Sequence, residues 1–235
     1  MALKQIDVGR PVNNIEAGVL KKMGMTVLND KIFIDERKIK ADRKTVGAKA
    51  KRKGGAFERT IATLLSMWWT NGMSKKEFAK TPRSGAWKFP QDLVPPEGCP
   101  FLISCKHEER WTGAEKTLYT DHRFKAYWEE VMESYRDLQG VNSKLFLQTA
   151  AVTPDKIVPM VIFTKNHDQN YLMIRWSDFT GLTALEPYHE KALKLDFDLT
   201  DGRLEVALLM VDDFLDWVSP EVVMEFAGFK RAKAI

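Results

Sequence analysis

Two segments of the chain carry hydrophobic residues at the spacing of an amphipathic helix. In AFERTIATLLSMWWTNG, residues 56–72, the apolar positions recur every three or four residues, and Asn71-Gly72 is a typical helix end. In DHRFKAYWEEVMESYRDLQG, residues 121–140, the apolar stripe is followed by Gly140. That stripe consists of Phe124, Trp128, Val131, Tyr135 and Leu138. Each segment therefore predicts one helix packed against a core.

Four apolar runs predict strands: PFLISCKHEE, SKLFLQTAA, IVPMVIFTKN and NYLMIRW, at residues 100–109, 143–151, 157–166 and 170–176. The last run leads into SDFTGL, which predicts a short helix capped by Ser177 or Asp178. VALLMVDDFLDWV, near the end of the chain, has a similar strand-to-helix corner. Helices that alternate with strands in this way indicate a mixed α/β domain whose central sheet is covered by helices.

Residues 1–53 have the pattern of an appendage, so we expect the main domain to span 54–235. TVLNDKIFI, residues 26–34, has two short apolar runs around Asn29-Asp30, which predicts a small hairpin. Nine Lys and Arg residues and a single acid then follow between positions 37 and 53. This basic segment is either a short helix or a flexible arm, and Gly54-Gly55 is expected to close it.

The basic segment has two interpretations. It is either a solvated linker or an arm that binds phosphate groups. In the second case Lys49, Lys51, Arg52 and Lys53 are the residues expected to contact nucleic acid. The net charge of +4 does not decide between them, because it is small for a chain of 235 residues.

Composition excludes several classes of protein. With 44% hydrophobic and 29% charged residues, most of the chain is expected to fold. No apolar run approaches the roughly 20 residues that span a bilayer, and the N-terminus lacks the apolar core of a signal peptide, so we expect a cytoplasmic protein without a membrane partner. Cys99 and Cys105 do not have zinc-site spacing, nor do the four histidines. The chain has no phosphate-binding glycine loop of P-loop type, which excludes that class of NTPase.

The stretch QDLVPPEGCPFLISCK, residues 91–106, places chemistry at the end of a strand. Because alternate side chains of a strand share a face, Ser104 and Lys106 point one way and Cys105 points the other. Asp92 reaches the same neighbourhood if its segment pairs with the strand as a hairpin, which the intervening prolines and glycine suit. By spacing alone, an ordinary surface ion pair between Asp92 and Lys106 is the favoured interpretation.

The order of elements and motifs over residues 54–180 resembles the PD-(D/E)XK nuclease superfamily, in particular the branch that contains archaeal-type Holliday junction resolvases and related phage proteins. The matching positions are Glu58 on the first helix, Ser84-Gly85, the motif acid Asp92, and Ser104-Cys105-Lys106 at the acid-x-Lys motif. The sequence departs from the motif at two positions. Gln91 stands where a glycine is usual, and Ser104 replaces the second acid.

The resemblance implies a restriction-endonuclease-like fold and a catalytic set of Asp92, Lys106, Glu58 and Ser104. It implies Mg²⁺, with Mn²⁺ as a substitute, as the cofactor that activates water and stabilises the leaving oxygen. The expected metal ligands are Asp92, Glu58, the Cys105 carbonyl oxygen and, as a displaced acid, Glu108. DNA contacts from the loop before Asp92 are expected at Arg83, Ser84 and Trp87. Branched DNA is the implied substrate, and a homodimer, able to make two symmetric cuts, is the implied assembly.

Ser104 leaves three functional hypotheses open, because a neutral hydroxyl is a poor magnesium ligand. The first is a metal-dependent DNA endonuclease of resolvase type that acts in DNA recombination. The second is a catalytically degenerate nuclease-fold protein that binds nucleic acid without cutting it. The third is an interaction protein whose basic arm binds an acidic partner or RNA.

Overall fold

The protein is represented by a computed structural model, which describes residues 3–7, 25–28, 31–81, 91–108, 122–138, 144–165, 169–183, 191–199 and 202–229. The chain divides into two compact units, Met1–Lys53 and Gly54–Ile235. In the first unit, β1 (Leu3–Asp7), β2 (Met25–Leu28) and β3 (Lys31–Asp35) form an antiparallel sheet in the order β1-β3-β2. β2 and β3 are adjacent in the chain, and Leu28 is paired with Lys31.

Helix α2 runs from Glu36 to Trp69, so the helix expected from residue 56 begins much earlier. The prediction that Gly54-Gly55 ends the basic segment is wrong, because α2 continues through both glycines. Each glycine costs a helix about 1 kcal/mol relative to alanine, and the buried contacts of Phe57, Ile61 and Leu65 offset this cost. The end of α2 agrees with the prediction, because Asn71 and Gly72 adopt positive φ angles of 51° and 86°.

The second unit is built on a five-stranded mixed sheet in the order β6-β7-β8-β10-β9. β6 and β7 are parallel, and the other neighbouring pairs are antiparallel. The strands are β6 (Phe101–Glu108), β7 (Val158–Lys165), β8 (Asn170–Arg175), β9 (Leu193–Leu199) and β10 (Gly202–Met210). β4 (Ala79–Lys80) and β5 (Leu93–Val94) form a separate two-stranded sheet. The strands predicted around residues 100–109, 157–166 and 170–176 are confirmed.

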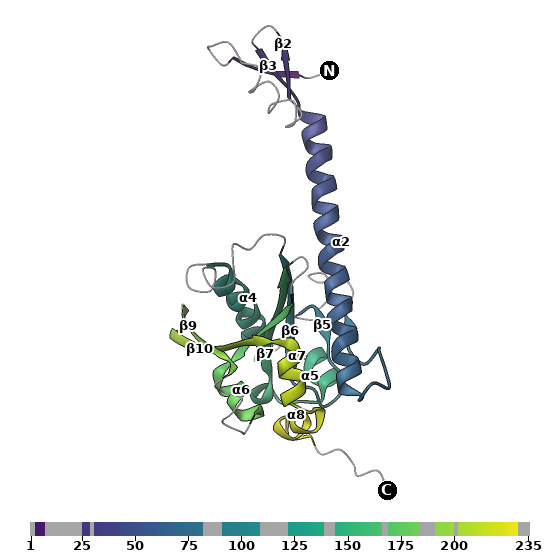
Figure 1. Ribbon diagram of the computed structural model, residues 1–235, viewed down its shortest axis with the longest axis vertical. Helices are drawn as coiled ribbons and strands as arrows, with labels where there is room; N and C mark the ends of the chain where they lie inside the picture. The colour runs from purple at the N-terminus through teal and green to yellow at the C-terminus, as the bar shows by residue number, and fades with distance from the viewer. Residues whose placement is uncertain are drawn as a thin grey trace. The chain divides into compact units, whose positions relative to one another are not determined.

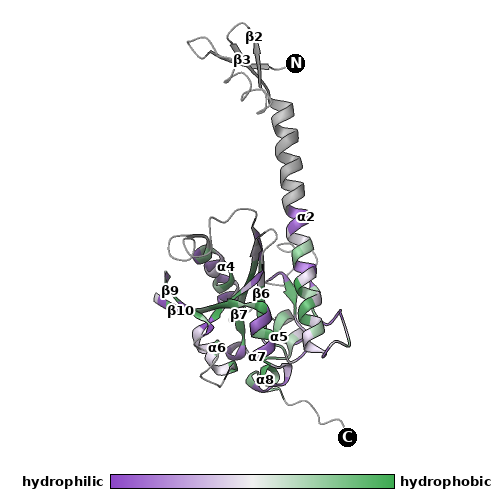
Figure 2. Cartoon of the chain, in the orientation of Figure 1, coloured by the Kyte–Doolittle hydropathy of each residue, from purple (hydrophilic) through white to green (hydrophobic). Residues whose placement is uncertain are grey.

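Helices cover both faces of this sheet, which confirms the mixed α/β, restriction-endonuclease-like architecture (Figure 1). α4 (His122–Leu138) and α5 (Lys144–Ala150) pack on one face. The part of α2 after residue 56 packs on the other face with α6 (Trp176–Leu182), α7 (Val211–Trp217) and α8 (Pro220–Phe226). A short 3₁₀ turn, Pro154–Lys156, precedes β7. The strands between the two helical layers are predominantly hydrophobic (Figure 2).

Two local predictions are wrong. Residues 143–151 were expected to form a strand, but Lys144–Ala150 is helix α5. Its fully buried residues, Phe146 and Ala150, are four positions apart, which is helical spacing in a run too short for the pattern to decide. Neither Ser177 nor Asp178 caps α6, because the N-cap residue is Arg175 and no side chain caps the helix. Asp178 instead forms an ion pair with the Arg175 guanidinium.

No helix in the described part of the chain combines the length and hydrophobicity required to cross a lipid bilayer.

Candidate active site

The site is organised around the outer edge of β6, because among the described strands of the five-stranded sheet β6 comes first and has β7 as its neighbour. At this edge the Asp92 N–H donates to the Ile103 carbonyl oxygen at 3.2 Å. The Cys105 N–H donates to Asp92 Oδ2 at 2.7 Å. On its other side, the Asp92 carbonyl accepts a 2.9 Å hydrogen bond from the Thr81 N–H. The main chain of Asp92 is therefore held between Ile103 and Thr81, and its carboxylate accepts the hydrogen bond from Cys105.

The expected hairpin between the Asp92 segment and β6 is not the pairing that forms. β5, which starts directly after Asp92, has its ladder with β4, where Leu93 is paired with Lys80. Among these hydrogen bonds, those that join the segment to β6 involve the Asp92 N–H and carboxylate alone. Pro95 and Pro96 lack the N–H that a ladder needs, so they limit any pairing with β6 beyond Val94.

Ser104 and Lys106 lie on the face of β6 that packs against α4, as the alternation of the strand predicts. Ser104 is fully buried, and its Oγ lies 3.5 Å from Asp92 Oδ2, which is long for a hydrogen bond. Lys106 Nζ donates to both carboxylate oxygens of Glu130 on α4, at 2.7 and 2.6 Å. The same ammonium lies 5.7 Å from the ring centroid of Tyr127. In this structure, α4 therefore holds the lysine.

Glu58 comes from α2 on the opposite face of the sheet. Its Oε2 is buried and lies 2.6 Å from Lys80 Nζ. The contact is an ion pair without hydrogen-bond geometry, because no donor in the described part of the chain hydrogen-bonds to this oxygen. Gly55 makes room for the lysine, since a Cβ at this position would lie 2.7 Å from Lys80 Nζ. Lys80 thus packs onto the helix one turn before Glu58.

The carboxylates influence one another through their charges. Burial raises the pKa of the Asp92 carboxyl above its ordinary value, and the hydrogen bond from Cys105 opposes this increase. The charges of Glu58 and Glu130 raise the pKa of Asp92 further, whereas Lys106 lowers it. Burial also raises the pKa of the Cys105 thiol, as do the charges of Asp92 and Glu58. A cation bound near Asp92 would relieve this repulsion.

The donor atoms at the β6 edge fit a magnesium ion. A strand residue turns its N–H and C=O to the same side, so the Cys105 carbonyl faces the edge where its N–H meets Asp92. Among the described residues, no group of three or more His, Cys, Asp or Glu side chains is placed to hold a metal ion. Mg²⁺ does not need such a cage, because it is usually held by one or two carboxylates together with water and substrate phosphate.

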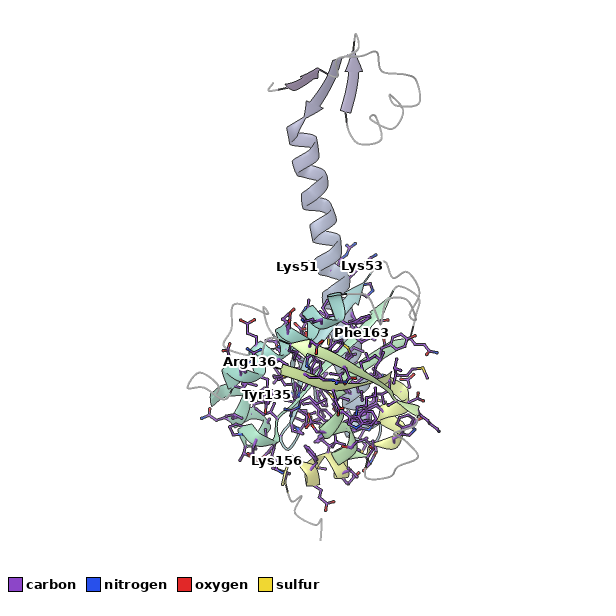
Figure 3. All side chains as sticks on the ribbon, turned by 90° about the vertical axis from the view of Figure 1, so that its left-hand side faces the viewer. Lys51, Lys53, Tyr135, Arg136, Lys156 and Phe163 are labelled. Atoms are coloured by element: carbon purple, nitrogen blue, oxygen red, sulfur yellow. The ribbon has the colours of Figure 1, made fainter. Side chains whose placement is uncertain are left out.

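Several residues predicted to take part lie outside the described residues. Arg83, Ser84 and Trp87 belong to residues 82–90, and the side chains of Lys49 and Glu108 are also not described. Lys51, Arg52 and Lys53 are exposed on α2, and Figure 3 shows Lys51 and Lys53 projecting from this helix.

Sequence reasoning missed two charged residues at the site, Lys80 and Glu130. Glu130 belongs to a Glu-Glu pair on the polar face of an amphipathic helix, and Lys80 lies in a short extended segment. Both patterns are also typical of ordinary surface residues. Only the packing of α4 against β6, and of β4 against α2, distinguishes these two residues from the other charged residues of their segments.

The sequence model of a protein family described as "phage putative PDDEXK endonuclease" matches residues 49–225. The match covers more than half of the 235-residue chain and includes Glu58, Asp92, Lys106 and Glu130. No curated protein and no solved structure matches the chain.

Proposed function

The chain belongs to the PDDEXK endonuclease family of phages, and from this premise we propose that it is a Mg²⁺-dependent endonuclease that hydrolyses phosphodiester bonds in DNA. Nucleases of the PD-(D/E)XK type typically use divalent metals, and a nuclease of this family implies DNA as the substrate. The observation that carries the proposal is the position of Asp92. Its carboxylate accepts a 2.7 Å hydrogen bond from the Cys105 N–H, one residue before Lys106 of the motif.

Each residue has a role in this proposal. The Asp92 carboxylate and the Cys105 carbonyl oxygen hold Mg²⁺ or, as a substitute, Mn²⁺, and Glu58 contributes negative charge from α2. When bound, the metal lowers the pKa of a water molecule and stabilises the leaving oxygen. The Lys106 ammonium orients the attacking water and offsets the charge that develops on the phosphate. The Ser104 hydroxyl lies beside the Asp92 carboxylate.

The finer parts of the proposal concern substrate and assembly. We propose branched DNA as the substrate, in a recombination reaction in the host cytoplasm, on the basis of the resemblance to the resolvase branch. A homodimer suits this substrate, because two cuts related by symmetry need two active sites. Arg83, Ser84 and Trp87 remain the loop residues proposed to contact DNA.

A second function is favoured by one observation, the burial of Ser104 at the position of the second motif acid. With a neutral residue at this position, the fold would bind DNA without cutting it. DNA binding that depends on salt but neither requires metal nor leads to cleavage would be the signature of this function.

The test is a cleavage assay on supercoiled, linear, flapped and four-way DNA with Mg²⁺ or Mn²⁺. We expect the full chain to cut at least one of these substrates and EDTA to stop the reaction. Asp92→Ala and Lys106→Ala should each reduce the rate by at least about 100-fold, because each removes a group that stabilises the transition state.

Asp212→Ala and Lys75→Ala are the matched controls. Each removes the same kind of charge from an exposed position, so each should cleave at the rate of the unaltered chain. If the unaltered chain binds all four DNAs and cuts none with either metal, the endonuclease proposal fails and the binding function replaces it.

A further inference from the structure

The neutral residue at position 104 leaves the motif position of β6 without the negative charge that the motif usually has there. Ser104 is fully buried beside the Asp92 carboxylate, and its hydroxyl is neutral. Glu58 supplies a carboxylate from the other face of the sheet. Its Oε2 lies 2.6 Å from Lys80 Nζ, so this carboxylate already has an ion-pair partner. At the motif position of β6, two residues before Lys106, Asp92 therefore has no second carboxylate beside it.

Helix α4 brings a carboxylate to the Lys106 side chain. Glu130 accepts hydrogen bonds from Lys106 Nζ through both of its oxygens, at 2.7 and 2.6 Å. Its side chain is 57% exposed, whereas that of Lys106 is only 19% exposed. An ion pair with one exposed partner contributes little to stability, so the need for a stable fold does not explain why Glu130 is at this position.

The core fixes the direction in which Glu130 points. Phe124, Trp128 and Val131 are buried and set the rotation of α4 against the sheet. Glu130 lies on the exposed face of α4, one residue before the buried Val131, and its side chain reaches Lys106 from there. Tyr127, one helical turn before Glu130, lies beside the same lysine. The position of Glu130 next to the motif lysine is thus determined by the packing of a whole helix.

We propose that Glu130 supplies the second carboxylate of the metal site, acting from α4 in place of the acid that β6 lacks at Ser104. The inference rests on the proposed nuclease function and names the residue that completes its ligand set for Mg²⁺ or Mn²⁺. With a cation at Asp92, one oxygen of Glu130 binds the metal. Lys106 is then free to contact a water or phosphate oxygen.

Neighbouring acids are less suitable. Glu129 Oε1 lies 3.8 Å from Lys125 Nζ, an ion pair within α4, and Glu129 has no described contact with Lys106. Glu133 lines a surface depression together with Glu129 and Glu130, but no contact of Glu133 with Lys106 is described. Among the described acids of α4, Glu130 is the one that hydrogen-bonds to Lys106, the lysine of the motif.

The test compares Glu130→Gln with Glu129→Gln in the full chain, because the two variants remove the same charge from adjacent positions. Mn²⁺ binding is measured by calorimetry and by electron paramagnetic resonance, and DNA cleavage in parallel. Glu130→Gln should weaken Mn²⁺ binding by about 10- to 100-fold and slow cleavage by at least as much. Glu129→Gln should change both by less than about twofold, since its carboxylate does not reach the metal.

A relocation variant gives a second measurement. Ser104→Asp in the Glu130→Gln background returns an acid to β6, so Mn²⁺ affinity should recover at least partly if the variant retains the melting temperature of the parent. Glu130→Asp, which keeps the charge on a shorter side chain, should bind Mn²⁺ more tightly than Glu130→Gln and does not alter the buried position 104.

The outcomes separate the two proposals. If the unaltered chain cuts DNA and Glu130→Gln binds Mn²⁺ with unchanged affinity, the role of Glu130 is refuted and the nuclease function stands. Loss of cleavage without loss of Mn²⁺ affinity also refutes it, because Glu130 would then only position Lys106. If the unaltered chain neither binds Mn²⁺ nor cuts DNA, the proposed function itself fails.

Discussion

Folding disfavours the ionised form of the Asp92 side chain. Its carboxyl is mostly buried, and the nearby charges of Glu58 and Glu130 add repulsion to the effect of burial. One backbone hydrogen bond, from Cys105, opposes both effects. Such destabilising placement is common at functional sites, where groups are arranged for a ligand and not for the stability of the free protein.

Asp92→Asn should therefore stabilise the metal-free protein at neutral pH. An acid whose pKa is raised by folding contributes stability below its unfolded pKa, near 3.8, and that stability is lost as the pH rises through the folded pKa. Above the folded pKa the ionised aspartate is unfavourable, whereas asparagine is neutral and can still accept the hydrogen bond from Cys105. We expect a higher melting temperature for the variant at pH 7 in EDTA.

The difference should diminish toward pH 4, where the Asp92 carboxyl of the parent protein is increasingly protonated. Saturating Mn²⁺ should reverse the order at pH 7, because it stabilises the parent and not the variant. Equal melting temperatures at both pH values, with and without Mn²⁺, would contradict this account of Asp92.

At the scale of single residues, sequence reasoning was most successful where neighbours in the chain determine the result. The alternation of a strand is enough to place Ser104 and Lys106 on one face, and the family motif directed attention to Asp92. Glu130 was not predictable in this way, because it is 24 positions beyond Lys106 and its contact depends on the packing of α4. Lys80 was missed for the same reason.

At the scale of elements, α2 differs most from its prediction. The basic segment is continuous with the helix that carries Glu58, and Gly54-Gly55 does not separate them. A glycine pair is a strong signal for a turn. Here the buried residues Phe57, Ile61 and Leu65, which follow the pair, favour a helix that continues through it. The exposed positions Lys51 and Arg52 lie in this continuous helix.

The double variant Lys51→Gln, Arg52→Gln tests whether these residues bind phosphate groups. If both bind DNA phosphates, the slope of log K against log salt should fall in magnitude by about 1.8, since each neutralised phosphate accounts for about 0.9. The matched control is Lys75→Gln, Lys76→Gln, which removes the same charge from exposed positions outside the basic segment. Binding is measured by fluorescence anisotropy in EDTA. Equal slopes for the two double variants would favour the interpretation of the segment as a solvated linker.

At the scale of the whole molecule, the pattern of helices and strands was sufficient to predict a mixed sheet between helical layers. The strand order was not predicted, and β9 was missed altogether. β9 is at the edge of the sheet and alternates leucine or phenylalanine with Lys194, Asp196 and Asp198. An edge strand with this many charges resembles an exposed loop in sequence, and its pairing with β10 is what identifies it.

The most direct test of the central claim, a metal site at the outer edge of β6, is the anomalous diffraction of Mn²⁺ in crystals of the full chain. We predict a peak at coordination distance from the Asp92 carboxylate and the Cys105 carbonyl oxygen, with Glu130 turned toward it. A structure with Asp92 well ordered at saturating Mn²⁺ and no peak at that carboxylate would contradict the account.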